Sequence, residues 1–463
     1  MRTALMLMCV CYVLWRPVSN GGILYPLLAL LAVLAVSKFV TGERGVFKPF
    51  AVAGYLLIIA GLITALIGSI KNNPGLAQQL TVWFGGIVIW GLWALSLTRD
   101  KIRLTLQVIT IATACLSGVI VLYVGAQQGL LPSFLPDSWL RSQDAGFDLT
   151  ADGSAIRLLG LSTLAAAGPL VASALVAGKD TFLPSRRLLV VATILAVVAA
   201  VLAGRRAIAA VTVLSPLLTY LFMRFLRPRT KARRPTRRYH AWVLASPLLF
   251  LSSLVAWRFS LLERPLAAVG DGVNLFFSSA SASGSSKSAG DHVREQQAHE
   301  LTAAWGNHPL FGHGLGAVLP DKFFRSAERP WMFELQYHDL LFTSGLVGVG
   351  LVLASLVSVW MGIRRAAAVN PEHVPTIVVT LVAALSMLIA NASNPYLQAV
   401  GHGWSIALVV GVANALLRPK LTPVPAAAES TDEERLEHEE HEEHEEHDDQ
   451  DEDAVQPVMT LMR

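Results

Sequence analysis

The chain has 463 residues, of which 53% are hydrophobic and 15% are charged, and its mean hydropathy is +0.51. This composition excludes an ordinary soluble globular protein and is typical of an integral membrane protein built from several helices. The three cysteines, Cys9, Cys11 and Cys115, lie in apolar runs, so they predict neither a disulfide framework nor a Cys-x-x-Cys metal site.

The net charge of +4 hides two opposite populations. Residues 421–463 hold 16 of the 33 acidic residues and 2 of the 37 basic ones, so residues 1–420 carry a formal charge of +18. Within the tail, residues 437–447 repeat Glu and His with a histidine every third position. Such a segment has little to bury and is expected to be disordered or a solvated helix, with weak divalent-metal binding as the alternative.

Twelve apolar runs are long enough, or nearly so, to cross about 30 Å of hydrocarbon as helices. They predict an all-α polytopic membrane protein of about twelve transmembrane helices. The first run resembles a signal peptide in length, but Arg16-Pro17 and the lack of an Ala-x-Ala cleavage pattern favour a retained helix. The predicted spans are 3–15, 22–38, 50–70, 80–98, 103–124, 158–178, 188–204, 207–226, 240–257, 339–361, 374–392 and 398–417.

Lysines and arginines collect in alternate connections, and the side richer in them is expected to be cytoplasmic. Both termini are then inside, and the long loop 258–338 lies outside. The predicted organisation is nine helices in 1–257, a loop domain with short helices in 258–338, three helices in 339–417, and a cytoplasmic tail in 418–463. The basic stretch 224–238 lies between two spans, so contact with anionic membrane lipids is expected and nucleic-acid binding is not.

Arg205 and Arg206 interrupt the apolar sequence between the seventh and eighth predicted spans, at the outer boundary and against the charge bias. One interpretation is that both side chains snorkel to lipid headgroups. The other is a site for a phosphorylated lipid, because a guanidinium matches phosphate oxygens in a bidentate way. Arg157, which we expect to open the sixth span from the same side, is a further candidate contact.

In the outer loop, residues 288–291 resemble a capping box that opens a helix. Arg294 then falls on the same helical stripe as Leu301 and Trp305, so its charge is expected to face the protein or the bilayer. Gly312, Gly314 and Gly316 alternate around His313 and predict a tight turn or the close approach of a ligand. His308 is expected to be a turn residue, and His313 is left between loop packing and ligand contact.

His338 immediately precedes a long apolar run at the outer boundary. There a neutral imidazole can accept a proton near pH 7 and act as a general base. The alternative is an interfacial histidine bonded to a backbone carbonyl. Asp339 is expected to cap the following helix.

Together, these features resemble the bacterial O-antigen ligase family: twelve spans, Gly-Arg-Arg-Ala at 204–207, His-Pro-Leu-Phe-Gly-His-Gly-Leu-Gly at 308–316, and a histidine entering a span that continues with Gly-Leu-Val-Gly. The resemblance covers roughly residues 150–400 and is strongest from 290 to 350. It implies a GT-C-like fold in the bacterial inner membrane, with the active site on the periplasmic face. It also implies inverting transfer of O-antigen polysaccharide from undecaprenyl diphosphate to a sugar of lipid A-core, without metal, nucleotide or other cofactor.

The resemblance assigns the essential loop histidine to His338 and the loop arginine upstream of the His-Pro motif to Arg294. Arg206 matches the Arg of the family's Ser-Arg pair, whereas Arg205 stands in place of the Ser. The implied roles are general base for His338 and stabilisation of the leaving diphosphate for the three arginines. The acidic residue that the family often has late in the bundle is missing, and Asn391 and Asn394 stand nearby instead.

Two other functions stay open. An O-antigen polymerase shares these motifs and the donor, but elongates a growing glycan. A lipid-linked oligosaccharide transporter would use the arginines to bind pyrophosphate, but it predicts charges along a midplane cavity and inverted repeats. Here the charges collect at one face, which favours an enzyme.

Overall fold

The computed structural model describes residues 2–18, 22–41, 45–142, 145–150, 153–158, 160–203, 205–227, 289–319 and 328–418. The chain divides into two units, Met1–Arg418 and Pro419–Arg463, and all the described residues belong to the first. The predicted span 240–257, the first part of the predicted outer loop and the acidic tail therefore lie outside the described residues.

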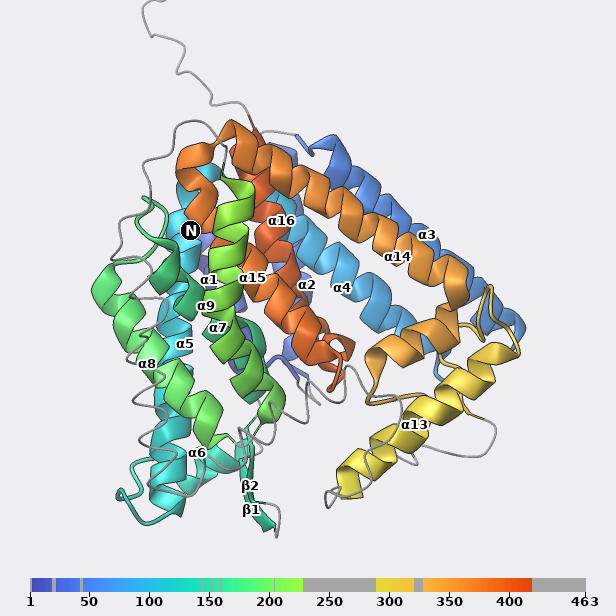
Figure 1. Cartoon of the computed structure of the whole chain (residues 1–463), viewed down its shortest axis with the longest axis horizontal. Coiled ribbons are helices and arrows are strands. Elements are labelled where there is room, and N and C mark those ends of the chain that lie inside the picture. The colour runs from blue at the N-terminus through green and yellow to red at the C-terminus, as the bar shows by residue number, and fades with distance from the viewer. Residues whose placement is uncertain are drawn as a thin grey trace, which may run out of the picture. The chain divides into compact units, whose positions relative to one another are not determined.

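The described part of the chain is helical apart from one short hairpin (Figure 1). Its α-helices are α1 (Arg2–Trp15), α2 (Leu24–Thr41), α3 (Lys48–Ile70), α4 (Leu76–Ser96), α5 (Ile102–Gln127), α6 (Asp137–Ser142), α7 (Leu164–Ala177), α8 (Arg186–Leu202), α9 (Arg206–Leu226), α13 (Ala289–Gly306), α14 (Gln336–Val369), α15 (Val374–Asn391) and α16 (Trp404–Leu417). Short 3₁₀ helices are η1 (Arg99–Lys101), η2 (Leu161–Thr163), η3 (Pro371–His373), η4 (Tyr396–Gln398) and η5 (Val400–Gly403).

Seven of these helical segments are long and apolar enough to cross a membrane. They are Lys48–Ile70, Leu76–Ser96, Arg99–Gln127, Ala207–Leu226, Gln336–Val369, Pro371–Asn391 and Val400–Leu417. The prediction of a helical membrane protein is confirmed in this form. Helices also occupy the other predicted ranges that are described, but they are shorter, as in α1 and α7.

The main core is formed where α15 packs against α7, α9 and α16. In α7, Ala165, Ala166, Ala167 and Gly168 are all buried. Small residues at these positions let helix backbones approach closely, which is the usual way that helices associate in a membrane. Long apolar runs explain why these segments are helices, because a helix satisfies all its backbone polar groups internally.

A two-stranded antiparallel hairpin is one short exception in the described part of the chain, which is otherwise helical as expected. Strand β1 (Gly146–Thr150) pairs with β2 (Gly153–Arg157) in a register that sets Gly146 opposite Arg157 and Phe147 opposite Ile156. Arg157 therefore ends a strand and does not open a membrane helix; α7 begins only at Leu164. Two five-residue strands leave no apolar run of membrane-spanning length, so a scan for such runs cannot detect them.

Helix α14 is broken at Gly345, whose φ of 61° and ψ of −169° are not helical. The longer second segment runs alongside α3, and α13 packs against α14 (Figure 1). A small second core lies here, separate from the main core, and consists of Leu301, Ala304, Ala317, Leu319, Phe333 and Phe342. The break thus lets the beginning of α14 join the loop domain while the rest of the helix belongs to the bundle.

Candidate functional site

The glycine-containing loop after α13 is tied to two helices by its backbone. His313 N donates to Phe342 O at 2.9 Å, and Gly314 N donates to Thr343 O at 2.8 Å, both at the break in α14. On its other side, Leu315 N donates to Thr64 O in α3 at 3.0 Å. Because α3 and α14 both hold the loop, the loop fixes where the first segment of α14 leaves the bundle.

The glycines of this loop are needed for close backbone packing. Gly312, Gly314 and Gly316 have φ values of 70°, 85° and 75°, in the left-handed region that other residues avoid. A Cβ atom on Gly312 would lie 2.5 Å from the carbonyl oxygen of Thr343, and one on Gly314 would collide with the backbone of Gly68. Of the two sequence interpretations, a tight turn and the close approach of a ligand, the backbone geometry supports the first.

His313 serves the packing of this loop. Its Nε2–H donates to the carbonyl oxygen of Ala304 at 2.9 Å, and its ring stacks on Phe342 with centroids 4.6 Å apart. Burial lowers the pKa of His313, and the positive charge of Lys71 lowers it further, although the hydrogen bond to Ala304 opposes this. A neutral ring held at the end of α13 favours the packing role over ligand contact. His308 is a turn residue as predicted, since its carbonyl accepts from Gly312 N at 2.9 Å.

Arg294, in α13, is held by an acidic partner from the segment before α14. Its Nε donates to Glu334 Oε2 at 3.0 Å, and both side chains are partly exposed. The buried Gln297, one turn further along α13, accepts the backbone N–H groups of Glu334 at 2.8 Å and Leu335 at 3.0 Å. The guanidinium therefore faces the protein, on the side predicted from the helical stripe, and its orientation is fixed by a carboxylate.

His338 lies in the first turn of α14, between one residue that contacts α15 and one that contacts η4. Tyr337 Oη donates to Leu388 O at 2.6 Å, near the end of α15. Asp339 is buried, and its Oδ2 accepts from Gln398 Nε2 at 3.5 Å. His338 itself is half-buried, and no residue in the described ranges forms a hydrogen bond with its imidazole.

The expectation that Asp339 caps α14 is wrong. The helix begins at Gln336, and its N-cap residue, Leu335, has no side-chain cap. Asp339 is thus already inside the helix, where its own backbone N–H donates to Leu335 O at 2.9 Å. An N-cap residue stands before the first helical residue. Because α14 begins at Gln336, three positions before the predicted start at residue 339, Asp339 cannot be its N-cap.

Tyr396 in η4 lies within electrostatic range of two of the predicted arginines. Burial raises the pKa of the Tyr396 phenol, and the positive charges of Arg205 and then Arg294 act on the same group and oppose that rise. Arg205 is exposed and is the N-cap residue of α9, with φ −94° and ψ 96°. Arg294 comes from α13, almost ninety positions later in the chain. The fold thus brings cations from two distant elements to one partly buried phenol.

The backbone of Tyr396 is held in place by His402. Because the carbonyl of Tyr396 can only accept, the Nδ1–H of His402 donates to it at 2.7 Å. The other ring nitrogen lies 2.9 Å from Ser162 Oγ, which links η4 to the turn before α7. His402 is fully buried. With both ring nitrogens engaged, this histidine fixes the position of η4 and of Tyr396.

Three other residues from the sequence analysis, Arg206, Arg157 and Asn391, lie in α9, in β2 and at the end of α15. Arg206 is the first residue of α9, directly after Arg205, and Arg157 ends β2; the side chains of both lie outside the described residues. Asn391 is buried, and its Oδ1 accepts from Leu397 N at 2.9 Å, so it shapes the turn that leads into η4.

Sequence reasoning missed Glu334, Gln297, Tyr396 and His402. His402 lies inside a predicted span, and an ionisable residue at such a position is itself a signal of function or special packing. Tyr396 follows Asn394 in a polar connection on the predicted outer side, which is a weaker signal. The pairing of Glu334 with Arg294 joins residues forty positions apart and leaves no local pattern.

The described side chains combine two cations, a phenol donor and a half-buried imidazole at one end of the bundle. Such a set can bind a phosphate or diphosphate group and accept a proton from a nearby hydroxyl. Comparison with protein-family models and with curated proteins finds no match for this chain.

Proposed function

We propose that this chain is a membrane glycosyltransferase of the O-antigen ligase type. In this proposal it spans the bacterial inner membrane about twelve times, with both termini in the cytoplasm and the site at the periplasmic face. The donor is undecaprenyl-diphosphate-linked O-antigen, the acceptor is lipid A-core, and no metal or cofactor takes part.

The observation that carries the proposal is that Arg294 is fixed by Glu334 at 3.0 Å, just before the helix segment that carries His338. The charges of Arg294 and Arg205 also act on one phenol, that of Tyr396. Arg205 is at the beginning of an apolar helix, where a cation meets the membrane boundary, and Arg294 is locked to Glu334. Fixed cations at this boundary suit a diphosphate that is joined to a membrane-embedded lipid. Arg206 adds a third guanidinium to this part of the chain.

In the proposed reaction, neutral His338 accepts the proton of an acceptor-sugar hydroxyl. The hydroxyl oxygen attacks the anomeric carbon of the donor glycan, and the bond from that carbon to the diphosphate oxygen breaks with inversion of configuration. Undecaprenyl diphosphate leaves with the electron pair. Arg205, Arg206 and Arg294 stabilise its charge, and the Tyr396 hydroxyl donates a hydrogen bond. Loss of one such donor typically costs about 2.7–4 kcal/mol of transition-state stabilisation.

The test uses the purified full chain with undecaprenyl-diphosphate glycan and lipid A-core, in the presence of a chelator. Glycan should appear on lipid A-core with wild-type protein and be lost in His338→Ala. His299→Ala is the matched control, because His299 is an exposed histidine of α13 outside the site, and it should retain activity.

Three outcomes would contradict parts of the proposal. Full activity in His338→Ala would remove the general base, and dependence on added divalent metal would refute the metal-free mechanism. Longer glycan on the undecaprenyl carrier, with none on lipid A-core, would identify a polymerase. Movement of the donor across the membrane without any transfer would identify a transporter.

A further inference from the structure

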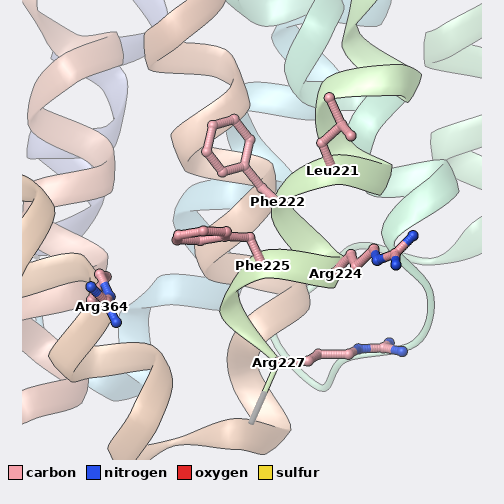
Figure 2. Close-up of a pocket in the computed structure, with 6 residues that line it drawn as sticks. All are labelled: Leu221, Phe222, Arg224, Phe225, Arg227 and Arg364. Carbon is pink, nitrogen blue, oxygen red and sulfur yellow. The ribbon is translucent and has the colours of Figure 1, made fainter. Parts of the chain in front are cut away.

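A second candidate site lies at the other end of α9. A cavity of 690 Å³ there is lined by Leu221, Phe222, Arg224, Phe225, Arg227 and Arg364 (Figure 2). From Arg205 to Arg224 the helix rises about 29 Å at 1.5 Å per residue, which is about the thickness of the hydrocarbon layer. The cavity therefore lies near the opposite membrane boundary and is separate from the site around Tyr396.

One wall of the cavity is aromatic. Phe222 and Phe225 both pack against Trp360 of α14, with ring centroids 6.0 Å and 5.8 Å apart. Leu221 and Phe225 remain 49% and 65% exposed, a degree of exposure that suits contact with acyl chains in a membrane helix. This wall provides an apolar surface that continues toward the bilayer.

The cavity also carries three cations. Arg364 lies 5.9 Å from the centroid of the Phe225 ring, at cation–π distance. Figure 2 shows the side chains of Arg224 and Arg227 extending from the end of α9 on the side away from Phe225, and Arg364 on the opposite side of that ring. Within the described residues none of the three arginines has an acidic partner.

We infer that this cavity binds a membrane lipid with an anionic phosphate headgroup. The guanidinium of Arg364, beside the Phe225 ring, holds the phosphate, because an Arg donates to phosphate oxygens in a charge-assisted way. The charges of Arg224 and Arg227, on the other side of Phe225, add to the attraction. The acyl chains lie along Phe225 and Leu221. A soluble phosphate compound would use the cations but would gain nothing from the exposed apolar wall. The inference is independent of the proposed transfer reaction.

The experiment is native mass spectrometry of the purified full chain in detergent, titrated with phosphatidylglycerol. We expect one tightly held lipid and weakening of about fivefold in Arg364→Gln, since one arginine near a membrane surface contributes about that much. Arg365→Gln is the matched control: Arg365 is the exposed neighbour of Arg364 on the same helix and is not part of the cavity lining. The paired variant Arg224→Gln with Arg227→Gln provides the same test if Arg364→Gln does not fold.

Equal weakening by Arg365→Gln would overturn the inference, because it would indicate general attraction to a basic surface. Equal affinity for phosphatidylcholine would also overturn it, since that headgroup has no net charge. Displacement of the lipid by glycerol 3-phosphate at equal concentration would assign the cavity to a soluble phosphate compound. Phe225→Ala should weaken phosphatidylglycerol while leaving any binding of glycerol 3-phosphate unchanged.

Discussion

Replacement of Gly345 by alanine is expected to disturb the junction on which the site depends. The backbone of Gly345, with φ 61° and ψ −169°, lies in a region that is essentially restricted to glycine. An alanine Cβ there would lie 2.5 Å from the carbonyl carbon of Leu310 and 2.6 Å from the backbone nitrogen of Gly312. Carbon atoms normally pack 3.5–4.0 Å apart, so the loop or the helix must move.

The expected loss of stability in Gly345→Ala comes first from its backbone conformation. Holding a residue with a side chain in this region costs about 1–3 kcal/mol, and the contacts with Leu310 and Gly312 add to that cost. Gly350, five positions along α14, has open space around its Cβ position. In regular helix, Gly→Ala stabilises by about 0.5–1 kcal/mol, so Gly350→Ala should be neutral or stabilising. The two substitutions on one helix should therefore have opposite signs.

The assay is thermal unfolding of the purified chain in detergent, followed by intrinsic tryptophan fluorescence at one scan rate. Gly345→Ala should unfold at a lower temperature than wild type, and Gly350→Ala at the same or a higher temperature. Equal midpoints for the two variants would refute the reasoning, because they would mean that Gly345 has no special backbone role.

Three further predictions concern single side chains. Glu334→Gln should raise the donor KM up to about fivefold with little change in thermal stability, because a partly exposed ion pair contributes about 0.2–1 kcal/mol but orients Arg294. Tyr396→Phe should lower kcat/KM about tenfold or more, as expected for losing a hydrogen bond to a charged group, whereas Tyr55→Phe on an exposed part of α3 should change nothing. The pKa of His313 is lower in the folded chain than in the unfolded chain, so the unfolded chain binds more protons. Thermal stability should therefore fall as the pH drops below about 6.5, where the unfolded imidazole titrates. His313→Gln should reduce this pH dependence.

The positions of the membrane helices were predictable because each coincides with an apolar run, and this signal is local. The break at Gly345 was not predictable, since its cause is a loop that approaches from α13 and needs the space that a side chain would fill. Helix ends were also misplaced: α14 begins at Gln336, which turned the predicted cap, Asp339, into a buried helical residue.

In the candidate site, too, residues with a local sequence signal could be predicted, whereas residues that depend on long-range contacts could not. Arg205 and Arg294 could be singled out because each cation occupies an unexpected position in the sequence. Tyr396 could not, because the fold brings their charges within electrostatic range of η4 from elements far apart in the chain. The partner of Arg294 was hidden for the same reason, as Glu334 follows no periodic pattern.

The break in α14 has a consequence for how the site is positioned. The first segment, which carries His338, is attached to the end of α15 through Tyr337 and to η4 through Asp339. Tyr396 is also in η4, so the proposed base and this phenol are held by neighbouring parts of the fold. The second segment of α14 packs on α3 and meets the first segment at Gly345. The first segment begins just after Glu334, the partner of Arg294. A change at Gly345 should therefore displace His338 and Glu334 together, so that kcat falls and the donor KM rises.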